Sequence, residues 1–199
     1  MSWLGRVHGG FVHPRRVGVL VDHFSELAPE GARLLDVGTG DGRIARAIAD
    51  RRPDLEVRGI DVLPRSDAAV PVEAFDGTRI PYEDGAFDAV LFVDVLHHTE
   101  DPLVLLREAL RVGRDALLIK DHTKQGWLAG PTLRAMDWVG NARHGVALPY
   151  NYWTPRQWES AWAELDVRVD AWIADPKLYP GPADWIFGRG LHFVAKLRV

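Results

Sequence analysis

The 199-residue sequence predicts an α/β domain in which a mostly parallel sheet carries helices on both faces. Two observations support this fold class. Short apolar runs of strand length alternate with segments of helical spacing from residue 14 to residue 122. The run Phe87–Asp94 is apolar at almost every position, which is typical of a strand that is covered on both faces of a parallel sheet.

The first part of the chain supplies two helices and three strands. Pro14–Leu27 has apolar residues at helical spacing before Pro29 and Gly31 end the helix. A second helix has an apolar stripe that includes Ile44 and Ile48. Strands are expected at Arg33–Val37, Leu55–Asp61 and Val70–Phe75. The connection between the last two has room for at most a turn or two of helix.

The strand–helix alternation continues through Phe87–Asp94, a helix over Pro102–Val112 and a strand over Ala116–Lys120. After residue 122 a helix is expected at Thr154–Leu165, and the last two strands at Val167–Ile173 and His192–Leu197. We expect a single domain over residues 1–199, with 123–153 and 174–190 as insertions on the substrate side.

The composition narrows the possible functions. The net charge is −4 and no run of Lys or Arg exceeds two residues, which disfavours a nucleic-acid partner. Cysteine is absent, so thiolate metal ligands and a cysteine nucleophile are excluded, and no metal site is predicted. No apolar stretch reaches the roughly 18 residues of a membrane span. We therefore expect a cytoplasmic protein, and its oligomeric state stays open.

A glycine-rich loop follows the first strand, in the sequence LDVGTGDG. Gly38 and Gly40 allow a tight turn and let a ligand lie against bare backbone. Dinucleotide-binding loops carry an apolar residue where this chain has Asp36, and a small residue where it has Arg43. Asp36 and Asp41 would also repel a pyrophosphate. The loop favours a ligand with a cationic end, although Asp36 can instead cap the next helix.

Two further acidic positions follow the next strands. Asp61 closes the second strand, where a carboxylate can accept both hydroxyls of a ribose. Asp76 and Gly77 follow the third strand, where they can contact an adenine or form an ordinary Asp-Gly turn. Ligands of open α/β sheets bind at the carboxyl ends of the strands, so the three sites belong together.

The segments LDVGTGDG, FDGTRIPY and FDAVLFVDVLHHTEDPLVLLREALRV, together with Asp61, resemble class I S-adenosylmethionine-dependent methyltransferases. The resemblance covers about Arg33–Asp121 and is strongest to the small-molecule type found in ubiquinone and menaquinone pathways. It implies a Rossmann-like, doubly wound, mostly parallel seven-stranded sheet with an antiparallel last strand. It also implies S-adenosylmethionine as the cofactor.

The resemblance implies a role for each matched position. Asp36 and the loop glycines would hold the methionine part of the cofactor, Asp61 the ribose, and Asp76 with Gly77 the adenine. Asp94 and Val95 would line the sulfonium side. The full set of implied cofactor residues is Asp36, Gly38, Gly40, Asp61, Val62, Asp76, Gly77, Asp94 and Val95.

The acceptor is expected to be a small molecule, hydrophobic or aromatic. The catalytic candidates are His122, which directly follows the fifth strand, and Tyr152 in the polar and aromatic stretch after it. His122 is of a residue type whose pKa suits neutral pH, but a polar residue at this place more often only satisfies loop backbone. His97 and His98 are expected to begin or cap a helix.

The late tryptophans divide into two groups. Trp158 and Trp162 lie four residues apart on a predicted helix and are expected to pack in the core. Trp127, Trp138 and Trp153 flank the polar insertion and can form an apolar lid.

Three other functions compete with this interpretation. A nicotinamide-dependent oxidoreductase is disfavoured by Asp36 and by Arg43 in the loop. An RNA methyltransferase is disfavoured by the net charge. A non-catalytic module that binds S-adenosylmethionine would carry the same acidic positions.

Overall fold

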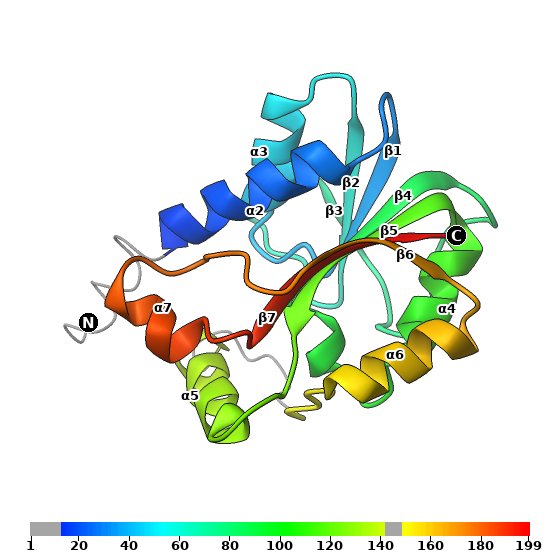
Figure 1. Cartoon of the computed structure of the whole chain (residues 1–199). Coiled ribbons are helices and arrows are strands. Elements are labelled where there is room, and N and C mark those ends of the chain that lie inside the picture. The colour runs from blue at the N-terminus through cyan, green and yellow to red at the C-terminus, as the bar shows by residue number, and fades with distance from the viewer. Residues whose placement is uncertain (1–12, 142–148) are drawn as a thin grey trace.

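A computed structural model describes residues 13–141 and 149–199. Its seven strands form one sheet in the order β3-β2-β1-β4-β5-β7-β6 (Figure 1). Strands β1 to β5 pair in parallel, whereas β7 lies antiparallel to both β5 and β6. The strands are β1 Arg33–Val37, β2 Glu56–Asp61, β3 Val72–Ala74, β4 Phe87–Val93, β5 Gly113–His122, β6 Arg168–Ile173 and β7 His192–Arg198. The predicted sheet, with its antiparallel last strand, is confirmed.

Helices cover both faces of the sheet (Figure 1). Leu20 and Phe24 of α2 pack with Leu34 on one face, and Leu105 and Leu106 of α4 pack in the core of the other. The predicted helices are observed at α2 His13–Leu27, α3 Arg43–Arg51, α4 Pro102–Val112 and α6 Pro155–Glu164. A 3₁₀ helix, η2, spans Leu96–His98.

Local sequence determines where helices α4 and α6 begin. The Asp101 side chain accepts a hydrogen bond from the Leu103 backbone N–H, and Pro102 occupies the first turn of α4. Thr154 and Gln157 form a reciprocal capping box at the start of α6. Such signals are readable without the tertiary fold, which is why these helix starts were predicted to within a residue.

Two helices were not predicted: α5 Ala129–Asn141 and α7 Pro182–Phe187. The α5 sequence AGPTLRAMDWVGN contains two glycines and a proline, which have the lowest helix propensity. The α7 helix has only six residues and starts at Pro182 directly after Gly181. Both helices therefore depend on their surroundings more than on an apolar stripe of their own.

The two segments predicted to be insertions, 123–153 and 174–190, contact each other at one end of the molecule. Figure 1 shows α5 and α7 side by side, and Arg189 donates a hydrogen bond of 3.1 Å to the Thr132 hydroxyl. Gln125 donates to the Gly190 carbonyl at 2.9 Å. The described parts of segments 123–153 and 174–190 thus pack against each other. Residues 142–148 of the first segment lie outside the described residues.

The tryptophans near the end of the chain are partly buried and partly exposed. The prediction that the two tryptophans of α6 pack in the core is confirmed. Trp158 and Trp162 are buried, with ring centroids 5.1 Å apart. Trp153 joins them in the core, 4.8 Å from Trp158, so it is a core residue. Trp127 and Trp138 are largely exposed, so they do not pack with Trp153 as one apolar layer.

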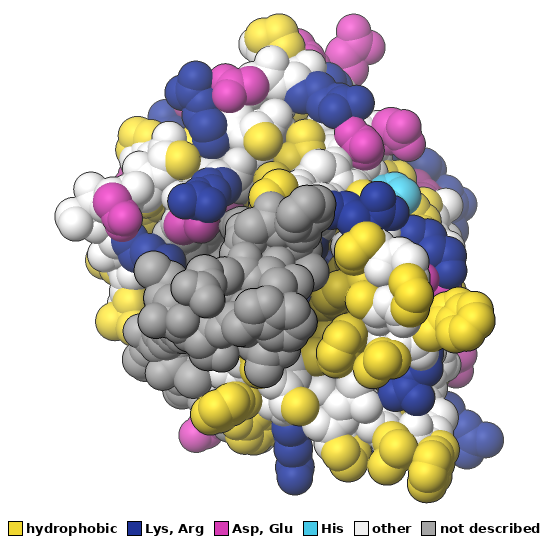
Figure 2. Space-filling model, turned by 90° about the vertical axis from the view of Figure 1, so that its left-hand side faces the viewer, with side chains coloured by type: hydrophobic (Ala, Val, Ile, Leu, Met, Phe, Trp, Pro, Cys, Tyr) yellow, Lys and Arg dark blue, Asp and Glu magenta, His cyan; other side chains and the backbone are white. Residues whose placement is uncertain are grey.

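Exposed hydrophobic side chains gather on the insertions. Figure 2 views the molecule from the side on which α5 and α7 lie, and hydrophobic side chains are grouped there. The exposed large residues of this region are Trp127, Leu128, Trp138, Val139, Trp185 and Ile186. Within residues 13–141 and 149–199, no helix is long and apolar enough to cross a bilayer.

Candidate functional site

Polar residues collect along the carboxyl edge of the parallel strands. Asp61 ends β2, Asp94 follows β4, and Asp121 and His122 end β5. Asp36 lies one residue before the end of β1, which pairs with both β2 and β4. Because these strands run in parallel, the side chains lie along one edge of the sheet, as the sequence predicted.

The glycine loop closes onto Asp61. Gly38, Gly40 and Gly42 have φ angles of +76°, +61° and +71°, a region that side chains other than glycine rarely adopt. The Gly40 backbone N–H donates to one Asp61 carboxylate oxygen at 2.8 Å, and the Leu63 N–H donates to the other at 2.8 Å. The loop and Asp61 therefore form one unit, brought together from residues 21 apart in sequence.

Two pairs of predicted cofactor residues are in contact. A Cβ atom added to Gly38 would lie 2.5 Å from a Val95 methyl carbon, so the loop backbone fits directly under Val95. A Cβ atom on Gly77 would lie 3.0 Å from a Val62 methyl carbon. Only glycine permits either approach, and the two contacts lie on the loops that follow β1, β2, β3 and β4.

Asp36 is a buried acid, with 3% of its surface exposed. Burial raises the pKa of Asp36 to about 7, and the neighbouring charge of Asp61 adds to the rise, whereas a hydrogen bond from Thr39 lowers it. The carboxyl group therefore titrates near neutral pH. A cation placed between Asp36 and Asp61 would stabilise both carboxylates.

Asp76 stands at the surface and closes its own turn. One of its carboxylate oxygens accepts from the Thr78 backbone N–H and the Arg79 N–H, each at 2.7 Å. These backbone bonds lower the pKa of Asp76. The turn that the sequence allowed is present, and a contact from Asp76 to adenine stays a prediction.

Asp94 joins the loop after β4 to the end of β5. It has a φ angle of +57° and forms ion pairs with Lys120 and Arg16. Burial alone would raise the pKa of Asp94, but the charges of Lys120 and Arg16 hold it well below its usual value. Lys120 is 1% exposed, so this carboxylate balances a fully buried cation.

His122 is buried beside this ion pair. Its Nε2 lies 3.4 Å from an Asp94 oxygen, and its backbone carbonyl accepts from the Trp158 indole at 3.1 Å. Burial and the charge of Lys120 hold the pKa of His122 well below its usual value, so the imidazole is neutral. Its Nδ1 is buried without a hydrogen-bond partner among the described residues.

His97 connects two buried carboxylates next to His122. Its Nδ1 lies 2.6 Å from an Asp121 oxygen and its Nε2 lies 3.3 Å from an Asp137 oxygen. Burial alone would lower the pKa of His97, but these carboxylates, Asp121 foremost, raise it to about 10. The expected helix start holds, since His97 is part of η2, but its ring serves a polar network.

Tyr152 completes this network. Its hydroxyl donates to the second Asp137 oxygen at 2.6 Å, and its ring lies 5.7 Å from that of His122. Burial and the Asp137 charge raise the pKa of Tyr152 above its usual value, so the phenol remains a hydrogen-bond donor. The two catalytic candidates therefore lie close together, and the Tyr152 hydroxyl contacts Asp137.

Asp137 and Arg16 were missed by the sequence reasoning. Asp137 lies on α5, a helix that the sequence did not predict, and it meets a histidine 40 residues earlier in the chain. Arg16 lies on the predicted helix α2, 78 residues before its partner Asp94. Each of these residues contacts a partner from a distant segment of the chain, so no local sequence pattern identifies it.

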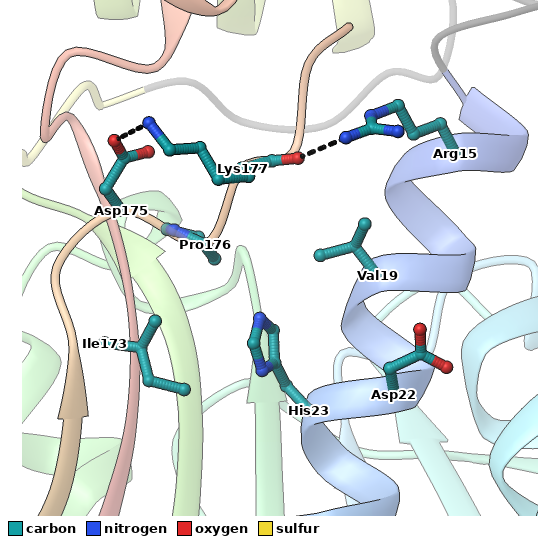
Figure 3. A pocket seen from close by; sticks show the side chains of 8 residues that line it. All are labelled: Arg15, Val19, Asp22, His23, Ile173, Asp175, Pro176 and Lys177. Atoms are coloured by element: carbon teal, nitrogen blue, oxygen red, sulfur yellow. Dashed lines mark hydrogen bonds and ion pairs between the residues drawn. The ribbon is translucent and has the colours of Figure 1, made fainter.

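A separate hollow of about 310 Å³ lies between α2 and the segment after β6. Figure 3 shows Val19 and His23 of α2 facing Ile173 and Pro176 across it. Arg15 donates to the Lys177 carbonyl at its rim. None of the predicted cofactor residues lines this hollow, so we assign it no part in cofactor binding.

The chain is similar in sequence to known methyltransferases. Residues 35–116 match the family described as Methyltransferase domain. An uncharacterized methyltransferase of Mycobacterium sp. (strain JLS) is 33% identical over 130 residues, which cover 60% of this chain and 50% of that protein. A ubiquinone biosynthesis O-methyltransferase of Idiomarina loihiensis is 24% identical, over 67% of this chain and 60% of that protein. The chain thus spans half to three fifths of these relatives.

Residues 35–116 thus resemble a methyltransferase domain, and the fold resembles that of solved S-adenosylmethionine-dependent methyltransferases. A methyltransferase structure from Aquifex aeolicus superimposes on 94% of this chain and 93% of its own, with a TM-score of 0.63 and 18% identity. The [4+2]-cyclase SpnF superimposes on 90% of this chain and 79% of its own, with a TM-score of 0.66 and 21% identity. At these identities the likeness concerns the fold alone, and proteins of different activity, a methyltransferase and a cyclase, have it in common.

Proposed function

We propose that this methyltransferase domain transfers the methyl group of S-adenosylmethionine to a small-molecule acceptor. The observation that carries the proposal is the unit formed by Asp36, Asp61 and the glycine loop at the carboxyl edge of β1 and β2. A nicotinamide dinucleotide would bring a pyrophosphate to this acidic loop, whereas S-adenosylmethionine brings an ammonium and a sulfonium.

In this proposal the cofactor lies along the strand ends. Its ammonium group occupies the space beside Asp36, and the ribose hydroxyls donate to Asp61, whose two oxygens keep lone pairs beyond the bonds from Gly40 and Leu63. The adenine lies against Val62 with Asp76 and Gly77 at its edge. Asp94 and Val95 line the sulfonium side, next to Gly38.

The acceptor enters from the side of the two insertions. Segments 123–153 and 174–190 form its walls, and their exposed aromatic side chains favour a hydrophobic or aromatic acceptor. Homologues of this domain include named small-molecule methyltransferases, among them the ubiquinone biosynthesis O-methyltransferase. The acceptor class is therefore inferred from the insertions and these relatives together.

The chemistry requires alignment and, for a hydroxyl acceptor, removal of one proton. The acceptor oxygen attacks the methyl carbon in line, the carbon–sulfur bond breaks, and its electron pair stays on sulfur. The neutral His122 imidazole, beside Asp94, accepts the hydroxyl proton. Tyr152 is a positioning residue in this proposal: its hydroxyl donates a hydrogen bond to Asp137 and holds that carboxylate in place.

Ligand binding tests the cofactor assignment. S-adenosylhomocysteine should bind and, at a hundred times its Kd, raise the free energy of unfolding by about 2.7 kcal/mol. NAD should have no effect. Calorimetry that detects NAD binding and no S-adenosylhomocysteine binding would refute the assignment.

A His122→Asn variant tests the catalytic role, once an acceptor has been found by screening hydroxyl compounds with labelled cofactor. Turnover should fall about 10²–10⁴-fold while the affinity for S-adenosylhomocysteine changes little. His23→Asn, on the outer helix α2, is the matched control and should leave both quantities unchanged. Full turnover by His122→Asn would remove this residue from the mechanism.

A further inference from the structure

Two adjacent histidines of η2 and one aspartate of α5 converge at the acceptor end of the site. The Nε2 atoms of His97 and His98 lie 3.3 and 3.8 Å from the same Asp137 oxygen. All three ligand atoms lie within 4.8 Å of one another. Two imidazole nitrogens and one carboxylate oxygen are a ligand set for a divalent transition metal, whereas Mg²⁺ and Ca²⁺ prefer oxygen ligands alone.

The distances suit a metal ion. Bonds of about 2.0–2.1 Å in a tetrahedral site place ligand atoms roughly 3.3 Å apart. The separation of His97 Nε2 from the Asp137 oxygen is 3.3 Å, and the separation of His98 Nε2 exceeds this value by only half an ångström. The two histidine nitrogens lie within 4.8 Å of each other, so the three ligand atoms would draw closer together around an ion. Three protein ligands of a tetrahedral site leave a fourth position for another ligand.

The surrounding groups orient these ligands as they do in metal sites. His97 Nδ1 lies 2.6 Å from Asp121, which is itself held by the backbone N–H groups of Leu96 and His122. A histidine ligand with a carboxylate on its second nitrogen is the common arrangement around bound metals. The second Asp137 oxygen is held by the Tyr152 hydroxyl. Each of these two ligands thus has an outer partner.

The cluster is largely removed from water. His97, Asp121 and Asp137 are all buried, and carboxylates removed from water need a compensating positive charge. Lys120 and Arg16 pair with Asp94 on the other side of His122. Asp121 and Asp137 both lie against the His97 ring, where a proton or a metal ion adds positive charge.

We propose that His97, His98 and Asp137 bind one divalent transition-metal ion, of which Zn²⁺ is the representative. Its role in catalysis rests on the proposed function: at the open position the ion would hold the acceptor oxygen and favour its deprotonated form. The hydroxyl proton would pass to His122, and the methyl group would move from sulfur to oxygen. Binding of the ion itself does not depend on the methyl transfer.

The test uses the full chain without an affinity tag, freed of metal by a chelator. Calorimetry with Zn²⁺ should give one ion per chain, and Co²⁺ should give visible absorption bands of a low-coordinate site. His98→Gln and Asp137→Asn should each weaken Zn²⁺ binding more than tenfold. His23→Gln on α2 is the control and should bind as the parent does.

The outcomes separate the proposals. Thermal unfolding and S-adenosylhomocysteine binding are measured on every variant, and unchanged values for His98→Gln show that the fold and cofactor site are intact. No Zn²⁺ binding by the parent chain, or equal binding by His98→Gln, overturns the metal site and leaves His97 as a hydrogen-bonded imidazolium only. Zn²⁺ binding without S-adenosylhomocysteine binding would support the metal site and refute the proposed function.

Discussion

Replacing Asp36 by Asn should stabilise the cofactor-free protein at high pH and weaken cofactor binding more than tenfold. Asp36 is 3% exposed, and its pKa rises from 3.8 to about 7 in the folded state. A shift of one pKa unit corresponds to about 1.4 kcal/mol, so the ionised carboxylate costs the fold about 4 kcal/mol. An amide carries no charge and avoids this cost.

The sign follows from proton binding. Between pH 3.8 and about 7 the folded chain holds a proton on Asp36 that the unfolded chain has lost, so stability falls as the pH rises. The loss is nearly complete about one unit above the folded-state pKa, near pH 8. The stability advantage of Asp36→Asn should therefore be about 3 kcal/mol larger at pH 8 than at pH 5.

Urea unfolding of both proteins at pH 5 and pH 8 measures this difference. Asp22→Asn, at an exposed acid of α2 that pairs with Arg51, is the control and is unfolded at the same two pH values. Calorimetry with S-adenosylhomocysteine measures the effect on cofactor binding. The parent's affinity should rise from pH 6 to pH 8 as Asp36 ionises. The Asp36→Asn variant should bind more than tenfold more weakly than the parent at pH 8. A variant whose stability parallels the parent's at both pH values would refute the reasoning.

Three further perturbations test the rest of the site and its support. Asp61→Ala should weaken S-adenosylhomocysteine binding by about 1–3 kcal/mol, measured by calorimetry, because two ribose hydroxyls lose a charged acceptor. Gly38→Ala should cost about 2–4 kcal/mol in urea unfolding, because a positive φ and a 2.5 Å approach to Val95 both oppose a Cβ, whereas Gly126→Ala, with φ of +81° in open space, should cost less. Trp158→Ala should cost about 3–5 kcal/mol in the same assay, since this buried ring packs at 5.1 Å on Trp162. Equal costs for the two glycine variants, or a Trp158→Ala cost below 1 kcal/mol, would contradict these assignments.

The strand–helix order through residue 122 could be predicted because its signals are local. An apolar run such as Phe87–Val93 needs cover on both faces whatever surrounds it, and a capping residue such as Asp101 specifies its helix start within three residues. The loop glycines after β1 are equally local, since their positive φ angles follow from the turn itself. The ends of the strands, where the aspartates predicted to bind the cofactor lie, could also be located from local sequence.

Where the local sequence has only a weak structural preference, tertiary contacts determine the secondary structure and the burial of side chains. Helix α5 has a poor intrinsic propensity but anchors Leu133 and Asp137, which are buried against the rest of the chain. Trp153, expected beside an insertion, instead packs on Trp158 in the core. In both cases the side chain's neighbours come from elsewhere in the sequence.

Local sequence patterns were enough to predict the fold class, the glycine loop and the row of acids at the strand ends. That burial raises the pKa of Asp36 to about 7, and that His97 lies between Asp121 and Asp137, became visible only in the folded chain. Burial and the proximity of charges depend on pairs of residues that are far apart in the sequence. A pattern of apolar and glycine residues fixes the backbone locally, but a side chain's electrostatic surroundings exist only after distant segments have packed together.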